Sequence, residues 1–230
     1  MNKSRRMAAL QARSLAEAGY AVLQIDLCGC GDSDGDFADA SWEAWLDDGM
    51  LGYRWLRQQT DAPLLLWGLR AGCLLAASVS AQLPEKADFI FWQPVVSGKQ
   101  HWQQFMRLKL AGELASGGGK EITEALKRQL ESGKNVEIAG YTVSPQLVEG
   151  LASAELSPQG TPGRVFWIET SLRDEATVTL ASVRYIDQWE AAGNAVSASV
   201  VRGPAFWQTT EIEDAPALIH ATIEAVGVRA

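Results

Sequence analysis

The sequence predicts an α/β fold with a mostly parallel sheet and helices on both of its faces. Short apolar segments rich in β-branched and aromatic residues alternate with longer segments whose apolar residues recur at helical spacing. The chain has 230 residues, of which 47% are hydrophobic and 21% are charged, and this is enough to bury one large core. Because strands that alternate with helices pair in parallel and are covered on both faces, we expect one domain over residues 1–230.

The first half of the chain predicts three helices and three strands. The best-marked helix covers residues 41–59, because Ser41 is a good N-cap and an apolar stripe of helical period follows it. That stripe is interpreted as core rather than as a binding surface. The helices are expected at residues 4–18, 41–59 and 71–81, and the strands at residues 21–26, 64–67 and 89–92.

The second half begins with a long insertion at residues 98–160, which has the position and the polar character of a lid. Its helical stretch runs from Lys99 to Ser132 and is interrupted by the segment from Ser116 to Gly119. The alternation then resumes, with strands expected at residues 165–168 and 198–201 and helices at residues 180–192 and 216–226.

Charge and hydropathy exclude several classes of partner. The net charge of −8 and the pI near 4.9 argue against a nucleic-acid surface, which needs clustered Lys and Arg. No run of 18 apolar residues is present, so we expect no membrane span. The basic start at residues 1–7 leads into an amphipathic helix rather than an apolar signal sequence, so we expect a cytoplasmic protein.

The cysteines do not predict a disulfide framework or a metal site. Only Cys28, Cys30 and Cys73 are present, together with two histidines, and Cys28-x-Cys30 lacks a second pair of ligands. We therefore expect buried or loop-packed thiols, no metal and no cofactor.

The segment Gly68-Leu69-Arg70-Ala71-Gly72 has the spacing of a nucleophile elbow, Gly-x-Ser-x-Gly, with an arginine in place of the serine. The predicted strand before it and the small-residue helix after it fit such a strand-to-helix turn. A guanidinium remains protonated and has no lone pair with which to attack, so Arg70 cannot be the nucleophile. A chance Gly-x-x-x-Gly after a strand is the alternative interpretation.

Three ordered segments resemble the α/β-hydrolase family. The loop from Asp26 to Ser33 is similar to the family's Asp-x-x-Gly-x-Gly-x-Ser loop, and the elbow at Arg70 follows at the right distance. The segment from Arg164 to Asp174 resembles the strand after the lid, whose loop carries the acid of the catalytic triad.

A narrower set of motifs resembles the exosortase A system-associated hydrolases of the second type. These motifs are Asn2 to Met7, Gly31-Asp32-Ser33, Trp67 to Gly72, Gln93 to Gly98 and Gly203-Pro204-x-Phe206-Trp207. The resemblance implies a bacterial setting of exopolysaccharide synthesis and protein sorting, with a possible small-molecule or saccharide ligand. It implies no defined substrate.

The triad positions implied by the family are not all of catalytic type. Arg70 stands at the nucleophile position, Asp174 at the acid position, and Phe206 (or Ala205) where the histidine is expected. His220 falls on the polar face of the last predicted helix, and His101 lies at the start of the insertion. We therefore expect no ordinary Ser-His-Asp esterase activity.

Two alternatives stay open for the function. One is a hydrolase with non-standard residues, for example with a water activated by Asp174 or Asp32. The other is a ligand-binding or scaffolding component of a polysaccharide export system. The candidate ligand-binding residues are Arg70, Asp174, Asp32 and Gln93.

Arg70 itself has two possible roles. A helix N-terminus favours an anion, so a guanidinium placed there needs a carboxylate nearby. Asp174 is the first choice for an internal ion pair, with Asp32 and Asp26 next. The second role is to bind an anionic ligand through two parallel hydrogen bonds.

The start of the chain lacks strands that the family resemblance implies. The predicted strand at residues 21–26 matches the family's fourth, and the family's third strand lies between the fourth and fifth in the sheet. We expect Met1 to be an internal methionine, with about 35 to 40 further residues upstream for three strands and their turns. The alternative is that the strands at residues 21–26 and 64–67 pair directly.

Overall fold

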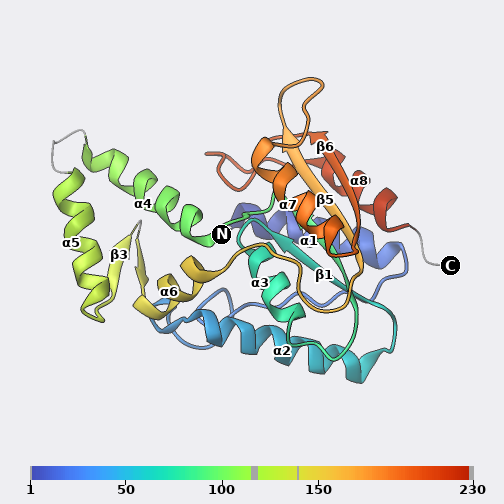
Figure 1. The fold of residues 1–230 in the computed structure, drawn as a ribbon, viewed down its shortest axis with the longest axis horizontal. Coiled ribbons are helices and arrows are strands. Elements are labelled where there is room, and N and C mark those ends of the chain that lie inside the picture. The colour runs from blue at the N-terminus through green and yellow to red at the C-terminus, as the bar shows by residue number, and fades with distance from the viewer. Residues whose placement is uncertain (1, 115–118, 139, 228–230) are drawn as a thin grey trace. The chain divides into compact units, whose positions relative to one another are not determined.

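The computed structural model describes residues 2–114, 119–138 and 140–227 (Figure 1). The chain divides into two compact units. The first unit consists of Met1–Gln24, Leu56–Val96 and Ser157–Ala230, and the second of Ile25–Trp55 and Ser97–Leu156.

The first unit is built on a four-stranded parallel sheet, as the alternating pattern predicts. Its strands are β1 (Leu64–Leu69), β2 (Ala87–Trp92), β5 (Arg164–Ser171) and β6 (Ala195–Arg202), in the order β1-β2-β5-β6. All three neighbouring pairs are parallel. The carboxyl ends of the strands therefore share one edge of the sheet, where ligand sites of open α/β sheets form.

One face of this sheet is covered by α3 (Gly72–Ser80) and α7 (Leu180–Ala191). Phe89 and Phe91 of β2 contact the ring of Trp189, with centroids 5.1 and 5.3 Å apart. These three side chains are nearly or completely buried, so α7 is held to the sheet by aromatic packing.

The opposite face is covered by α1 (Asn2–Glu17) and α8 (Pro216–Val226), which Figure 1 shows behind the strands. Ile90 and Trp92 point to this side because successive residues of a strand face opposite ways. They belong to a buried cluster with Met7, Leu15, Phe166, Ile168, Phe206, Ala215, Leu218 and Val226. Helices thus cover both faces, which confirms the predicted fold class.

The second unit contains helices that the sequence predicts, namely most of α2 (Trp42–Gln59), α4 (Gly98–Leu114) and α5 (Gly119–Glu131). It also contains shorter elements that the sequence pattern does not reveal, which are η1 (Phe37–Asp39), β3 (Val136–Ile138), β4 (Tyr141–Val143) and α6 (Pro145–Ser153). The antiparallel β3–β4 hairpin has only three residues in each strand, too few for an alternation to be read. The α6 start has a readable signal, because the Ser144 hydroxyl caps the helix by accepting from Leu147 N–H.

The helix predicted at residues 41–59 is confirmed as α2, and Ser41 caps it. The Ala44 N–H donates to Ser41 Oγ over 3.0 Å. The predicted helical interruption lies largely outside the described residues, which omit residues 115–118. Residues 97–156 supply the larger part of the second unit, and the lid role of residues 98–160 stays a prediction.

The strand predicted at residues 21–26 is wrong. Residues 20–27 have no regular secondary structure, and Leu23 and Ile25 are 36% and 39% exposed. An apolar β-type pattern forms a strand only where a partner supplies hydrogen bonds and a packed face. In the sheet as described, β1 is a terminal strand that pairs with β2 alone, so the direct pairing of residues 21–26 with β1 is also not formed.

Candidate functional site

Arg70 occupies the turn between β1 and α3, as the elbow spacing predicts. Its φ angle is 55°, a left-handed conformation that is uncommon for a residue with a side chain. Three backbone hydrogen bonds hold the turn: Arg70 N–H donates to Trp92 O over 3.0 Å, and Arg70 O accepts from Cys73 and Val95 N–H over 3.1 and 3.2 Å. The turn is therefore bonded both to β2 and to the helix that follows.

Of the two glycines in the motif, only Gly68 is required by close packing. A Cβ atom on Gly68 would lie 2.6 Å from the backbone of Gly72 and Cys73, whereas a Cβ on Gly72 would have nothing within 4 Å. Backbone atoms at this distance can make room only if the strand-to-helix turn shifts.

We expect Gly68→Ala to lower the free energy of unfolding by about 1 to 3 kcal/mol, because the added methyl overlaps backbone. Gly72→Ala is expected to leave the free energy of unfolding unchanged or to raise it by up to roughly 1 kcal/mol, the difference in helix propensity. Residue 72 is the first residue of α3, and its added Cβ would have no atom within 4 Å. Urea denaturation of both variants measures the difference. Equal stability of the two would contradict this account of the turn.

The Arg70 guanidinium has a neutral acceptor and an aromatic ring as its neighbours. Nη1 donates to Gln93 O over 3.1 Å, and Cζ lies 5.3 Å from the ring centroid of Trp207. No carboxylate in the described part of the first unit forms an ion pair with it. Burial lowers the pKa of Arg70, and the proximity of Cys73 and Glu169 partly opposes this lowering. The group remains a cation at neutral pH.

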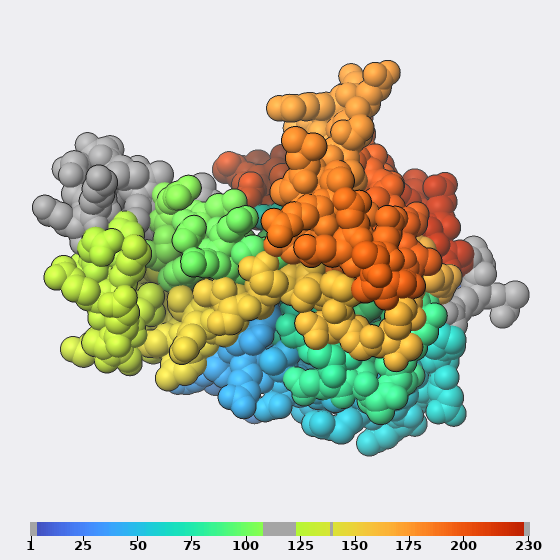
Figure 2. All heavy atoms as spheres, in the orientation of Figure 1, coloured from blue at the N-terminus to red at the C-terminus, as the bar shows by residue number. Residues whose placement is uncertain are grey.

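The expected ion pair between Arg70 and Asp174 is wrong. Asp174 Oδ1 accepts from Arg202 Nη1 over 3.0 Å, and both side chains are more than 70% exposed. The loop after β5 carries Asp174 away from the sheet and projects into solvent, as the orange segment in Figure 2 shows. Arg202 pairs in register with Ser171, three residues before Asp174, and so lies within its reach.

Both the backbone and the side chain of Gln93 form hydrogen bonds within the protein. It follows β2 with a φ of 43°, and its carbonyl accepts from Arg70. Its Oε1 accepts from Thr170 N–H over 2.7 Å, which ties the end of β2 to the end of β5. A ligand contact by Gln93 stays a prediction.

The loop after β6 turns Trp207, and not Phe206, toward Arg70. Phe206 is completely buried, with its ring 6.4 Å from Trp92 and 5.1 Å from Trp207. The residue that faces the elbow is thus one position beyond the one expected from the sequence. Neither an aromatic hydrocarbon nor an indole can accept the proton of a nucleophile.

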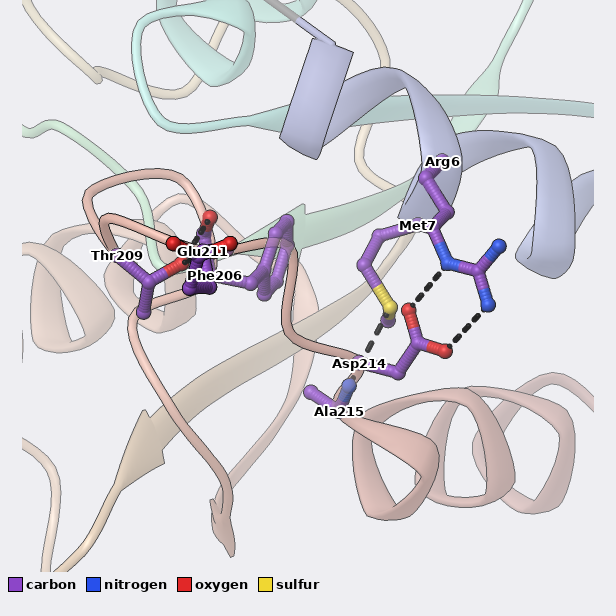
Figure 3. A network of polar contacts seen from close by, with 7 residues as sticks. All are labelled: Arg6, Met7, Phe206, Thr209, Glu211, Asp214 and Ala215. Atoms are coloured by element: carbon purple, nitrogen blue, oxygen red, sulfur yellow. Dashed lines mark hydrogen bonds and ion pairs between the residues drawn. The ribbon is translucent and has the colours of Figure 1, made fainter.

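Side-chain contacts at two points hold this loop in place (Figure 3). The Thr209 hydroxyl bridges Phe206 O and Glu211 O, at 3.2 and 2.7 Å. Further along, Asp214 forms a two-bond ion pair with Arg6 of α1, with both N–O distances 2.8 Å. These contacts hold the segment from Phe206 to Asp214, which contains Trp207.

Sequence reasoning missed Glu169, a buried carboxylate of β5 that is 3% exposed. It accepts from Trp167 Nε1 over 3.0 Å, from Thr179 N–H over 3.2 Å and from the Ser182 hydroxyl. Thr179 caps α7, so Glu169 fixes the start of that helix. The sequence signal that could have revealed Glu169 is an acidic residue within the otherwise apolar sequence of the predicted strand.

His220 and Asp32, two other positions considered from the sequence, are both exposed. His220 is exposed on α8, as expected for a surface histidine. Asp32, in the second unit, has an exposed side chain, and its N–H donates to Asp26 Oδ2 over 3.1 Å. A ligand-binding role for Asp32 stays a prediction.

Cys73 points into the fold, as its place one turn after Arg70 predicts. Its side chain is fully buried, and Sγ donates to Gly68 O over 3.2 Å. Burial raises the pKa of the Cys73 thiol, so the nucleophilic thiolate is disfavoured.

We expect iodoacetamide at pH 8 to modify Cys28 and Cys30 in the folded protein but to leave Cys73 unmodified. Cys28 and Cys30 are partly exposed, whereas Cys73 is protected by both burial and its raised pKa. Peptide mass spectrometry measures each site, with a urea-unfolded sample as the control. Rapid modification of Cys73 in the folded protein would contradict its placement.

Metal-binding clusters and membrane-spanning helices are both absent from the described residues. Within residues 2–114, 119–138 and 140–227, no group of three or more His, Cys, Asp or Glu side chains could hold a metal ion. No helix in the same residues is long and apolar enough to cross a membrane.

Comparison with known proteins identifies a family and a fold. The family described as serine aminopeptidase, S33, matches residues 1–169. No curated protein shows significant sequence similarity to the chain. The similar solved structures include two at 15% identity: Est1E from Butyrivibrio proteoclasticus, determined with ferulic acid bound, and the α/β hydrolase GrgF from Penicillium sp. sh18.

The structural similarity extends over almost the whole chain. Est1E aligns with 96% of this chain and 80% of its own, with a TM-score of 0.59. GrgF aligns with 94% and 79%, with a TM-score of 0.51. At this identity the similarity shows the fold alone.

Proposed function

The chain belongs to the serine aminopeptidase S33 family, and from this premise we propose that it lacks the ordinary Ser-His-Asp esterase activity and instead binds a ligand at Arg70. The observation that carries the proposal is the Arg70 turn itself. The turn keeps the left-handed backbone of a nucleophile elbow but presents a guanidinium, and the ring of Trp207 faces it.

The chemistry of acyl transfer supports this proposal. It requires a nucleophile, a base that takes its proton, and an acid that orients the base. Here a cation replaces the nucleophile, an indole faces it where a base is needed, and Asp174 is engaged with Arg202 in solvent. Loss of the nucleophile or the base alone lowers the rate of such enzymes by several powers of ten.

The proposed biological setting is exopolysaccharide synthesis and associated protein sorting in bacteria. Support comes only from the motifs that resemble the exosortase A system-associated hydrolases, among them Gly31-Asp32-Ser33 and Gln93 to Gly98.

A fluorophosphonate probe tests the absence of an activated serine. We expect no covalent labelling of the folded protein under conditions in which a serine esterase, used as the positive control, is labelled completely. Labelling that is lost on heat denaturation would contradict the proposal, and mass spectrometry would locate the serine responsible.

We expect Arg70→Ser to show no hydrolysis of p-nitrophenyl acetate above the buffer rate. The new hydroxyl would have no base beside it, because the neighbouring side chain is Trp207. Initial rates of the purified variant measure this. Substantial turnover by the single variant would show that a base exists elsewhere.

The matched comparison adds a histidine to Arg70→Ser at each of two positions. Trp207→His places an imidazole toward residue 70, whereas Phe206→His places it in the buried cluster. Any gain in rate is therefore expected only in the Trp207→His combination.

A further inference from the structure

We infer that Arg70 and Trp207 together bind the carboxylate of a small organic acid, an inference that rests on the ligand-binding function proposed above. The guanidinium would donate two parallel hydrogen bonds to the carboxylate. The indole N–H of Trp207 would donate a further hydrogen bond.

Arg70 carries a positive charge that no carboxylate in the described part of this unit neutralises by an ion pair. A guanidinium has five N–H donors, and among the described residues of this unit the acceptor bonded to it is the neutral carbonyl of Gln93. The side chain is partly withdrawn from water, and this withdrawal lowers its pKa. A cation in such a place is stabilised by a bound anion far more than by an uncharged ligand.

Glu169 and Asp174, the two carboxylates considered as partners of Arg70, are already bonded to other groups. Glu169 contributes negative charge to the surroundings of Arg70, but its oxygens accept from Trp167, Thr179 and Ser182. Asp174 is paired with Arg202. The anion that complements Arg70 must therefore come from outside this set.

The indole of Trp207 adds an independent unsatisfied donor. Trp207 Nε1 is shielded from solvent and has no hydrogen-bond acceptor among the residues that the structure describes, although the ring lies against Arg70. Most buried N–H groups in folded proteins have a partner, so an orphan beside an unpaired cation indicates a missing acceptor. We assign this acceptor to an oxygen of the bound carboxylate.

Charge and shape favour a carboxylate over a phosphate dianion. The site offers one cation with Glu169 nearby, and the whole chain carries a net charge of −8. A monoanion suits this field better than a dianion, and its planar pair of oxygens matches the guanidinium. The Trp207 ring also gives an apolar or sugar body a surface on which to lie.

Two probes distinguish the possible sources of the carboxylate. Benzoate represents an aromatic acid and glucuronate represents an acidic sugar, while benzamide is the uncharged control for benzoate. Isothermal titration calorimetry in a buffer free of carboxylate and phosphate gives each dissociation constant. We expect at least one acid to bind, and benzamide to bind at least about tenfold more weakly than benzoate if the aromatic acid is the one bound.

Matched variants assign the binding to the site. Arg70→Gln is expected to weaken binding of the acid by about tenfold or more, since a charge-assisted pair is lost. Arg202→Gln removes an exposed arginine of the same unit and is expected to change binding by less than about twofold. The indole ¹H–¹⁵N resonance of Trp207, assigned by its absence in Trp207→Phe, is expected to shift on saturation with the acid.

Several results would overturn the inference. These are no binding of either acid at 10 mM, tighter binding of inorganic phosphate than of both acids, or equal effects of Arg70→Gln and Arg202→Gln. If Arg70→Gln does not fold, the unmodified protein provides the test: an indole resonance of Trp207 that does not shift on saturation with the acid would overturn the inference. Fluorophosphonate labelling would contradict the proposed lack of esterase activity alone, so the two failures are distinguishable.

Discussion

Glu169→Leu is expected to lower the free energy of unfolding by about 3 to 5 kcal/mol, because it removes the charged acceptor shared by three donors and leaves the buried Trp167 indole without an acceptor. These donors are the Trp167 indole, the Thr179 backbone N–H and the Ser182 hydroxyl. Leucine is similar in size to glutamate, so the loss reflects hydrogen bonding rather than a cavity. Urea denaturation followed by circular dichroism gives the free energy and the m-value.

Two control variants sharpen this expectation. Glu169→Gln keeps one oxygen acceptor in place and is expected to cost less than Glu169→Leu. Asp174→Leu removes a carboxylate that is 81% exposed and is expected to change stability by no more than about 0.5 kcal/mol. A Glu169→Leu protein as stable as the original would show that these hydrogen bonds do not hold α7 to β5.

The second large effect is expected for Trp189→Ala, with a loss of about 3 to 5 kcal/mol. Trp189 is fully buried, and its ring contacts both Phe89 and Phe91 at centroid distances near 5 Å. Truncation removes the ring that joins α7 to β2 and leaves a cavity in the sheet face. Thermal and urea unfolding measure the loss, and Trp55→Ala is the matched control.

Trp55 suits this comparison because it is 50% exposed on α2. Its truncation is expected to cost less than about 1 kcal/mol, since little contact surface is removed. Equal losses for the two tryptophans would contradict the placement of Trp189 in the core.

The central elements could be predicted because their signals are local. β2 and β5 are apolar runs that the sheet buries on both faces, and Ser41 caps α2 through its own side chain. Residues 21–26 carry the same apolar pattern, yet they form no strand. An apolar β-type pattern shows only that a segment can form a strand. Whether it does so depends on a neighbouring strand, which the pattern of the segment itself does not reveal.

The candidate site also contains one residue whose place could be predicted from local sequence and others whose place could not. The position of Arg70 follows from the glycine spacing and from the strand before it, both within a few residues. Its neighbours Trp207 and Glu169 come from β-strands and loops about 100 or more residues away in the sequence. The direction of Trp207 depends on how Phe206 fills the core, and that can be read only from the packed structure.

The left-handed turn at Arg70 also has a consequence for conformational entropy. A flexible arginine side chain loses about 2 kcal/mol of rotamer entropy when a ligand immobilises it. Here the backbone is bonded at Trp92, Cys73 and Val95, and the guanidinium already rests between Gln93 O and the Trp207 ring. Most of that ordering takes place during folding, so an incoming anion meets a donor that is already preorganised.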